Sequence, residues 1–359
     1  MSVSTTEVLT QDAIWEALRH AWFPVARSQD IEQPQLAILL GEELVVYRTE
    51  QERRPVVASN RCAHRGAGLH LGKVHGNTIA CPYHGWRWSA DDGRCTFIPA
   101  LGERGVPPSK ASVQTYPVRE EWGLVWTCLE TPVTDLPVIA RQDTVEWAYG
   151  NGTPIHAHAG LAAATENFRD MAHFPFVHEG TFGPTPEYLE PFDVSYDGIE
   201  ASFEKVFAPN ADADPKMWPD SVLWQYHVVA PSFAWITFDH GRDGRHILLN
   251  ISRPVSPEEC VLYWVECLEP AFSVGTLDEW VEFEERVYAE DRPILESLRP
   301  REVPFTQPDV VEHSTRADKF TLAYRRAFRE FVRRASALAA GDDVVAPNHG
   351  HVVEADVPR

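Results

Sequence analysis

Short apolar runs separated by turn residues dominate the first third of the chain. Residues 11–22 place Ile14, Leu18 and Trp22 at a helical spacing, and the pattern changes after Pro24. From there, apolar runs at 36–40, 44–47, 56–58 and 122–127 alternate with turn residues, which is typical of strands. We therefore predict an N-terminal helical segment at 1–22, an all-β domain at 23–130 and a proline-containing linker at 131–138.

Beyond the linker, helical and strand patterns are mixed. Helices are predicted at 160–172, 277–298 and 318–339, and strands at 192–207, 221–238, 246–254 and 260–268. This order favours an antiparallel sheet packed against helices, a helix-grip-like domain at 139–340, followed by a flexible tail at 341–359. The predicted fold class is α+β with two domains, because 359 residues exceed what one core normally organises.

The net charge of −21 narrows the choice of partners. Such a field repels phosphate, so we expect neither nucleic acid nor an anionic membrane surface as a partner. The first 28 residues hold no continuous apolar run, and we expect no signal peptide, no membrane span and a cytoplasmic protein. Four scattered cysteines are expected to be free thiols: Cys95, Cys128, Cys260 and Cys267.

The most specific motif lies within the predicted β domain. Cys62 and His64 form a C-x-H segment, and after a gap of sixteen residues Cys81 and His84 form a C-x-x-H segment. Two thiolates on one iron and two imidazoles on the other make a Rieske [2Fe–2S] centre. Zinc also binds two Cys and two His, but zinc fingers usually pair like with like, whereas each segment here supplies one of each. The stretch resembles the Rieske domain of Rieske non-haem iron oxygenases.

A second candidate site is the pair His173 and His178. Positions five apart on a regular helix point about 140° away from each other. We expect Pro175 to end the helix near His173, so that His178 turns back to the same centre. An isolated pair of this kind would be interpreted as two structural histidines. Beside a Rieske motif it favours a mononuclear Fe(II) centre, which needs two His and one carboxylate and leaves positions open for O2.

The resemblance supplies the third ligand. Residues 289–296 resemble the segment that carries it in vanillate-demethylase-like and dicamba-monooxygenase-like Rieske oxygenases, the branch that also holds phthalate-oxygenase-like enzymes. This implies Asp291 as the iron ligand, with Glu290 as the alternative.

The resemblance also implies how the two centres communicate. Asp170 would join His173 to His84 of a neighbouring chain, and Asn167 would lie near the iron without binding it strongly. The implied assembly is a homotrimer.

The implied function is that of a terminal oxygenase, which uses O2 to hydroxylate or oxidatively demethylate a small organic, aromatic or polycyclic substrate. Ring cis-dihydroxylation is the alternative within this class. A non-catalytic Rieske electron carrier is the alternative from another class, but it needs only about 130 residues. Aromatic side chains on the predicted strands are candidates for the pocket: Trp224, Tyr226, Phe233, Trp235 and Phe238.

Electrons must come from another protein. The chain has no G-x-G-x-x-G loop and no plant-type ferredoxin cysteine spacing, which predicts a separate NAD(P)H-dependent reductase, with or without a ferredoxin. Residues 51–90 carry six basic residues against the single acid Glu52. This excess is either a docking surface for an acidic carrier or a chance distribution. The basic residues are Arg53, Arg54, Arg61, Arg65, Lys73 and Arg87.

Overall fold

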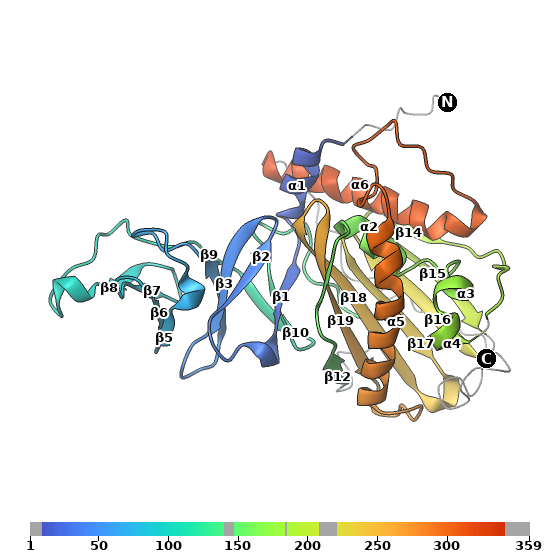
Figure 1. Cartoon of the computed structure of the whole chain (residues 1–359), viewed down its shortest axis with the longest axis horizontal. Helices are drawn as coiled ribbons and strands as arrows, with labels where there is room; N and C mark the ends of the chain where they lie inside the picture. The colour runs from blue at the N-terminus through green and yellow to red at the C-terminus, as the bar shows by residue number, and fades with distance from the viewer. Residues whose placement is uncertain (1–8, 140–146, 184, 208–220, 342–359) are drawn as a thin grey trace.

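The computed structural model describes residues 9–139, 147–183, 185–207 and 221–341. A strand-rich N-terminal domain lies beside a larger domain of one sheet and several helices (Figure 1). The predicted α+β class and the all-β first domain are confirmed. Most of the predicted tail, from residue 342, lies outside the described residues. No described helix has the length and apolar content that a membrane crossing requires.

The N-terminal domain consists of three small antiparallel sheets. Its helix α1 (Gln11–Leu18) is shorter than the predicted segment and ends before Trp22. The sheets have the strand orders β1-β11-β10, β2-β3-β4-β9 and β5-β6-β7-β8. The strands are β1 (Phe23–Arg27), β2 (Gln35–Leu39), β3 (Glu42–Arg48), β4 (Pro55–Ser59), β5 (Lys73–His75), β6 (Thr78–Ala80), β7 (Arg87–Ser89), β8 (Cys95–Phe97), β9 (Thr115–Tyr116), β10 (Val118–Glu121) and β11 (Leu124–Thr127).

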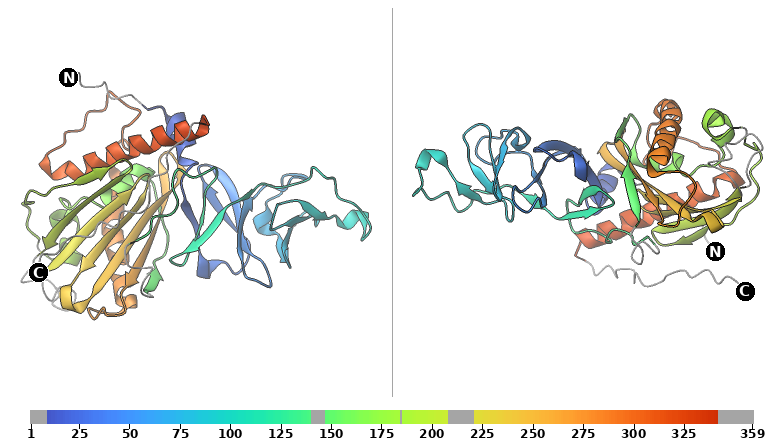
Figure 2. Two further views of the ribbon diagram at one scale, coloured as in Figure 1. Left: turned by 180° about the vertical axis from the view of Figure 1, so that it is seen from behind. Right: turned by 90° about the horizontal axis from the view of Figure 1, so that it is seen from below.

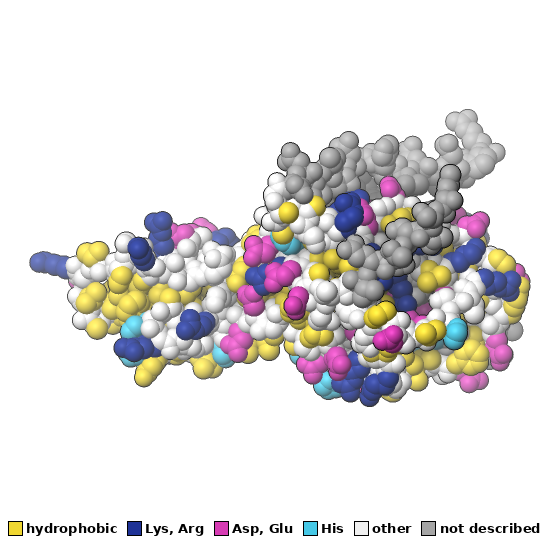
Figure 3. Space-filling view, turned by 90° about the horizontal axis from the view of Figure 1, so that it is seen from above, with side chains coloured by type: hydrophobic (Ala, Val, Ile, Leu, Met, Phe, Trp, Pro, Cys, Tyr) yellow, Lys and Arg dark blue, Asp and Glu magenta, His cyan; other side chains and the backbone are white. Residues whose placement is uncertain are grey.

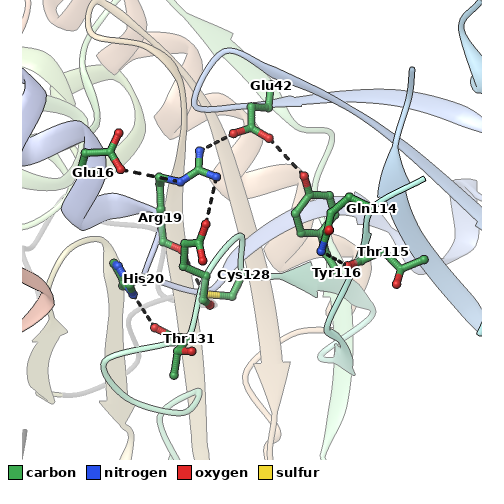
Figure 4. Close-up of polar contacts among 10 residues, drawn as sticks. Glu16, Arg19, His20, Glu42, Gln114, Thr115, Tyr116, Cys128 and Thr131 are labelled. Atoms are coloured by element: carbon green, nitrogen blue, oxygen red, sulfur yellow. Dashed lines mark hydrogen bonds and ion pairs between the residues drawn. The ribbon is translucent and has the colours of Figure 1, made fainter. Parts of the chain in front are cut away.

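The end of α1 is tied to this domain through Arg19 (Figure 4). Its guanidinium donates to Glu42 on β3 and to Glu130 after β11, and Tyr116 also donates to Glu42 at 3.2 Å. Nδ1 of His20 lies 2.6 Å from the carbonyl of Thr131. These contacts join three distant segments, so the helix belongs to the body of the molecule.

The second domain is built on one eight-stranded antiparallel sheet. Its strand order is β12-β19-β18-β17-β16-β15-β14, and β13 also pairs with β19. The predicted strand at 192–207 is a hairpin that turns at Gly198, whose φ is +59°, and the strand at 221–238 is also two strands. The strands are β12 (Ala148–Asn151), β13 (Ile155–Ala157), β14 (Ser195–Asp197), β15 (Glu200–Phe207), β16 (Val222–Val229), β17 (Phe233–Asp239), β18 (Arg245–Ser256) and β19 (Glu259–Leu268).

Helices pack around this sheet (Figures 1 and 2). They are α2 (Leu161–Asn167), α3 (Phe174–Val177), α4 (Glu179–Phe182), α5 (Leu277–Ser297) and α6 (Lys319–Ala339). Short 3-10 helices occupy Ser28–Asp30, Leu69–Leu71, Pro99–Leu101, Gly241–Asp243 and Arg316–Asp318.

Helix α5 begins at a capping box, in which Thr276 and Glu279 satisfy each other's backbone N–H groups. Its buried positions follow the helical spacing expected of a core-facing stripe, and two of them are acidic, Glu284 and Asp291. Because an unpaired buried carboxylate is costly, these two positions point to a site on this face of α5.

The two domains are in direct contact. The N–H groups of Leu40 and Gly41 donate to the carbonyls of Pro254 and Val255, both at 3.0 Å. The guanidinium of Arg253 donates to the carbonyl of Val25 at 3.2 Å and to the Tyr263 hydroxyl at 2.9 Å. Residues 131–138 form no helix or strand.

Candidate metal centres

Two similar loops carry the cysteines of the first candidate centre. Cys62 follows β4 and Cys81 follows β6, and each carbonyl accepts from a glycine N–H four residues later. The distances are 2.8 Å for Gly66 and 3.0 Å for Gly85, and both glycines have positive φ, +76° and +69°. Such tight turns favour glycine because a Cβ is strained there.

The two loops bring their histidines together. The ring centroids of His64 and His84 are 4.6 Å apart, and His64 stacks on Trp86 at 4.3 Å. Cys62 and Cys81 are buried, whereas His84 is exposed. The two segments of the motif therefore lie side by side at the surface of the domain.

The chemistry of this donor set fits a Rieske cluster. Nδ1 of His64 is buried and has no hydrogen-bond partner within the described residues, as expected of an atom that binds a metal. Burial raises the pKa of the Cys62 thiol, and the nearby Cys81 raises it further. Two thiols so placed are stabilised as thiolates by metal binding.

The second candidate centre lies where α2 ends and α3 begins. The break comes earlier than predicted, because α2 ends at Asn167. Pro175 does not end a helix; it occupies the first turn of α3, where its missing N–H costs nothing. His173 and His178 are the residues that flank this one-turn helix. Asp170 and His173 consequently contact each other within the turn between α2 and α3.

Three side-chain atoms converge at this point. Nε2 of His173 and Nε2 of His178 are 3.1 Å apart, and Oδ1 of Asp291 lies 3.4 Å and 3.3 Å from them. Two imidazoles and one carboxylate on one side of a centre are the set that non-haem Fe(II) takes. Within the described residues, this trio is the group whose ligand atoms lie close enough to share one ion.

Each of the three residues has a further polar contact. Nδ1 of His173 lies 3.4 Å from Asp170, Nδ1 of His178 lies 2.9 Å from Glu290, and the Asn167 amide donates to Asp291 at 3.2 Å. Contacts of this kind orient metal-binding histidines. Glu290 also accepts from Thr181 at 2.7 Å, so both of its oxygens are engaged away from the three converging ligand atoms.

The charge around His178 favours its protonated form in the metal-free protein. Burial lowers the pKa of His178, but the hydrogen bonds and charges of Asp291 and Glu290 outweigh burial and raise it. A bound divalent ion would replace that proton.

An apolar cavity opens beside the trio, between α3, α4, α5 and the sheet. Trp224 and Phe238, two of the five aromatic residues predicted for a pocket, line it. Tyr226 stacks on Phe203, Phe233 packs against Trp122 and Trp126, and Trp235 stacks on His227, so these three fill other contacts.

Sequence reasoning missed most of the cavity. Its lining includes Trp280, Phe283, Glu284 and Tyr288 of α5. The signal was present, because positions 284 and 288 lie seven and three residues before Asp291 and so share its helical face. The full lining is Asn167, Phe168, His173, Phe174, His178, Phe182, Trp224, Ile236, Phe238, Leu248, Trp280, Phe283, Glu284, Val287, Tyr288 and Asp291.

Together, the fold and the two centres define an iron-dependent oxygenase with a Rieske domain. Residues 21–117 match the Rieske [2Fe-2S] domain family, and residues 155–334 match the family of the vanillate O-demethylase oxygenase C-terminal domain. The chain therefore belongs to the Rieske non-haem iron oxygenases, in the branch with this C-terminal domain. This family uses a [2Fe–2S] cluster, mononuclear iron and O2.

Two relatives from Pseudomonas putida cover most of the chain. The methylxanthine N1-demethylase NdmA is 31% identical over 326 residues, which are 88% of this chain and 89% of NdmA. The methylxanthine N3-demethylase NdmB is 27% identical over 340 residues, 87% of this chain and 89% of NdmB.

Solved structures agree with this assignment. The structure of NdmA with caffeine matches with a TM-score of 0.76 at 28% identity and covers 90% of this chain and 96% of that chain. Dicamba monooxygenase bound to dicamba shares the fold, with a TM-score of 0.74 at 19% identity, covering 90% of this chain and 99% of that chain.

The oxidoreductase NdmD of Pseudomonas putida is 42% identical over 113 residues, only 31% of this chain and 19% of NdmD.

Proposed function

We propose that this chain is a terminal oxygenase that oxidatively demethylates or hydroxylates a small organic substrate. In this proposal Cys62, His64, Cys81 and His84 hold the [2Fe–2S] cluster, and His173, His178 and Asp291 hold Fe(II). When bound, the two groups supply one-electron transfer and O2 activation. The observation that carries the proposal is the convergence of three ligand atoms on the wall of an apolar cavity.

The chain's own residues account for the rest of the chemistry. Asp170 and Glu290 orient the two histidines, and Asn167 holds the carboxylate of Asp291. The rings of Phe174, Phe182 and Trp224 keep water from the substrate side. Oxidative N-demethylation is supported by the similarity of the chain to the N-demethylases NdmA and NdmB.

A separate NAD(P)H-dependent reductase is the proposed electron donor, directly or through a ferredoxin. Figure 3 shows Lys and Arg side chains next to hydrophobic ones over the Rieske end of the molecule. Exposed apolar residues there include Leu71 and Tyr83, and the ring of Tyr83 lies tilted against that of His84, with 3.8 Å between the ring centroids. Of the six basic residues, Arg54 is paired with Asp91 at 2.6 Å. The other five basic residues leave an excess of positive charge at which an acidic electron carrier would dock.

We further propose that the working assembly is a homotrimer. In both Figure 1 and Figure 2, β5–β8 lie at the end of the molecule away from α3, α4 and α5. Electron transfer would then run between neighbouring chains, from His84 of one to His173 of the next. Two observations support Asp170 as the link: its side chain contacts His173 and is 36% exposed.

The proposal is tested on the purified, anaerobically reconstituted protein. We expect three iron atoms and two acid-labile sulfides per chain; two iron atoms would indicate an electron carrier, and zinc would indicate neither. With an NADH-dependent reductase, a panel of N-methyl and O-methyl compounds that includes caffeine should yield formaldehyde from at least one member. Dihydrodiol products without formaldehyde from an aromatic panel would replace this assignment by ring dihydroxylation.

A further inference from the structure

A buried acidic pair lies at the α5 side of the cavity and has no role in holding the proposed iron. Glu284 lines the cavity and is 6% exposed. Glu266 on β19 is completely buried, and neither of its carboxyl oxygens has a hydrogen-bond partner among the described residues. Burial and the charge of Glu284 raise the pKa of Glu266. Unpartnered carboxyl groups in a core are costly, so they require an explanation.

The sheet places Glu266 on the cavity side. Ile236 pairs with Leu248, and Leu248 pairs with Glu266, so the three stand in one row across β17, β18 and β19. Residues directly opposite each other in a sheet share a face. Because Ile236 and Leu248 line the cavity, Glu266 continues the row and lies beneath its α5 edge.

The polar groups next to Glu266 and Glu284 provide hydrogen-bond acceptors and few donors. The Asn250 amide donates to the Tyr288 hydroxyl at 2.6 Å, which leaves the Asn250 carbonyl oxygen buried and without a partner. Tyr288 lines the cavity one turn after Glu284. This corner therefore offers several unused oxygen acceptors within an apolar surround.

Apart from the two histidines of the metal centre, the described lining carries no side chain that takes a positive charge. None of the described lining residues is Lys or Arg, and half of them are Phe, Trp or Tyr. Aromatic faces together with carboxyl groups attract organic cations, but they offer no favourable interaction to a carboxylate. At Glu284 and Glu266 an anionic substrate would meet two further acids and no Lys or Arg of the described lining.

We infer that Glu284, backed by Glu266, is a receptor for a positively charged nitrogen, so that the substrate is an organic cation such as a protonated amine. The N–H group of the cation donates to the Glu284 carboxylate, and the unpartnered carboxyl group of Glu266 lies behind it as a further acceptor. The apolar part of the molecule packs against the aromatic wall, which includes Trp224, Phe238 and Phe283. This inference rests on the proposed function, because it names the substrate class of the same cavity.

The experiment measures binding, not turnover. Three probes of closely similar shape are titrated into the holoenzyme without O2 or reductant: N,N-dimethylbenzylamine as the cation, isobutylbenzene as its neutral carbon isostere, and phenylacetate as an anion. Quenching of tryptophan fluorescence reports the dissociation constants, since Trp224 and Trp280 line the cavity. We expect the cation to bind at least ten-fold more tightly than either of the other probes.

Variants then locate the effect. Glu284→Gln should weaken the amine at least ten-fold and leave isobutylbenzene within two-fold, and Glu266→Gln should weaken the amine at least three-fold. Glu282→Gln removes the same charge from an exposed position of α5 and should change neither constant. A loss of amine binding in Glu282→Gln as large as in Glu284→Gln would assign the effect to overall charge and overturn the inference.

The comparison of probes on the unaltered enzyme needs no variant to fold. Equal affinity for the amine and isobutylbenzene, or tighter binding of the anion, would overturn the inference even if the enzyme proves to be an active oxygenase. Conversely, an amine preference that depends on Glu284 would stand if the iron analysis contradicted the proposed oxygenase. Failure of the cation inference and failure of the proposed oxygenase function therefore give different experimental results.

Discussion

Oε2 of Glu290 lies 2.9 Å from Nδ1 of His178, on the side of the ring opposite the nitrogen that faces Asp291. Two adjacent acids of α5 thus act on the same imidazole from opposite sides. Asp291 is placed to share an ion with it, and Glu290 is placed to orient it. The alternative of Glu290 as the ligand is disfavoured by this geometry, since its other oxygen accepts from Thr181.

The first prediction follows from this contact. Glu290→Gln should weaken Fe(II) binding at pH 8 by about 10- to 100-fold, the usual cost of losing a carboxylate behind a metal-binding histidine. Glu285→Gln, an exposed acid on the same helix, should leave Fe(II) binding unchanged. Anaerobic titration with a fluorescent iron competitor measures both. Equal iron affinity in Glu290→Gln and the unaltered protein would show that this contact does not support the site.

The pH dependence has a defined sign. Asp291 and Glu290 raise the pKa of His178 above that of an ordinary histidine, which is about 6.5. In the metal-free protein the His178 ring therefore stays protonated to a higher pH. The pairing stabilises the metal-free fold at low pH and is lost as the pH rises through the raised pKa. Iron must displace the proton, so iron affinity should fall on acidification from a pH above about 6.5. A flat affinity between pH 8 and pH 6 would contradict this.

The two centres should be separable by mutation. Asp291→Ala should lose the mononuclear iron and all turnover while keeping the absorbance of the cluster, because Asp291 does not touch the Rieske loops. Asp278→Ala, at the start of α5, serves as the control. Iron and sulfide analysis with visible spectroscopy checks the result, and full iron occupancy with turnover in Asp291→Ala would move the ligand assignment elsewhere.

A change at His84 should act on the cluster alone. His84→Cys would replace an imidazole by a thiolate, and the reduction potential should fall from the Rieske range, roughly −150 to +300 mV, toward the roughly −400 mV of all-cysteine ferredoxins. Electron delivery to the second centre should become unfavourable. Protein-film voltammetry measures the midpoint, and an unchanged midpoint and absorbance would remove His84 from the ligand set.

The trimer proposal is tested by mixing two inactive variants. His84→Ala lacks a working cluster, and Asp291→Ala lacks a working iron site. After subunit exchange, mixed rings place an intact cluster beside an intact iron site of the neighbour, so partial turnover should return. Asp170→Asn should keep both metals and lose most turnover, because the link at His173 is weakened. A fully active monomer in sedimentation, or no rescue in rings proven to be mixed, would contradict the proposal.

The pattern of the chain predicted the long elements well. The helix predicted at 277–298 is α5 (Leu277–Ser297), and the strand predicted at 260–268 is β19 (Glu259–Leu268). Both carry a clear period that local propensity and burial support together. Elements were misplaced where a turn interrupts an apolar run, as at Gly198, or where a proline starts a helix, as Pro175 does. A single apolar pattern does not separate one long strand from a hairpin.

The sequence by itself determined the chemistry that this protein can hold. Two Cys and two His in short segments, a histidine pair and the acids of α5 are local facts, because residue type and spacing decide which metals can be bound. The tertiary structure decided how these residues are arranged around the site and which of them face it. It turned Asp291 toward the histidines and Glu290 behind one of them, kept Tyr226, Phe233 and Trp235 out of the cavity, and brought Glu266 of the sheet to the Glu284 side of that cavity. These outcomes depend on the rotation of α5 against the sheet and on strand register, which arise from packing between segments far apart in the chain and leave no mark in the spacing of neighbouring residues.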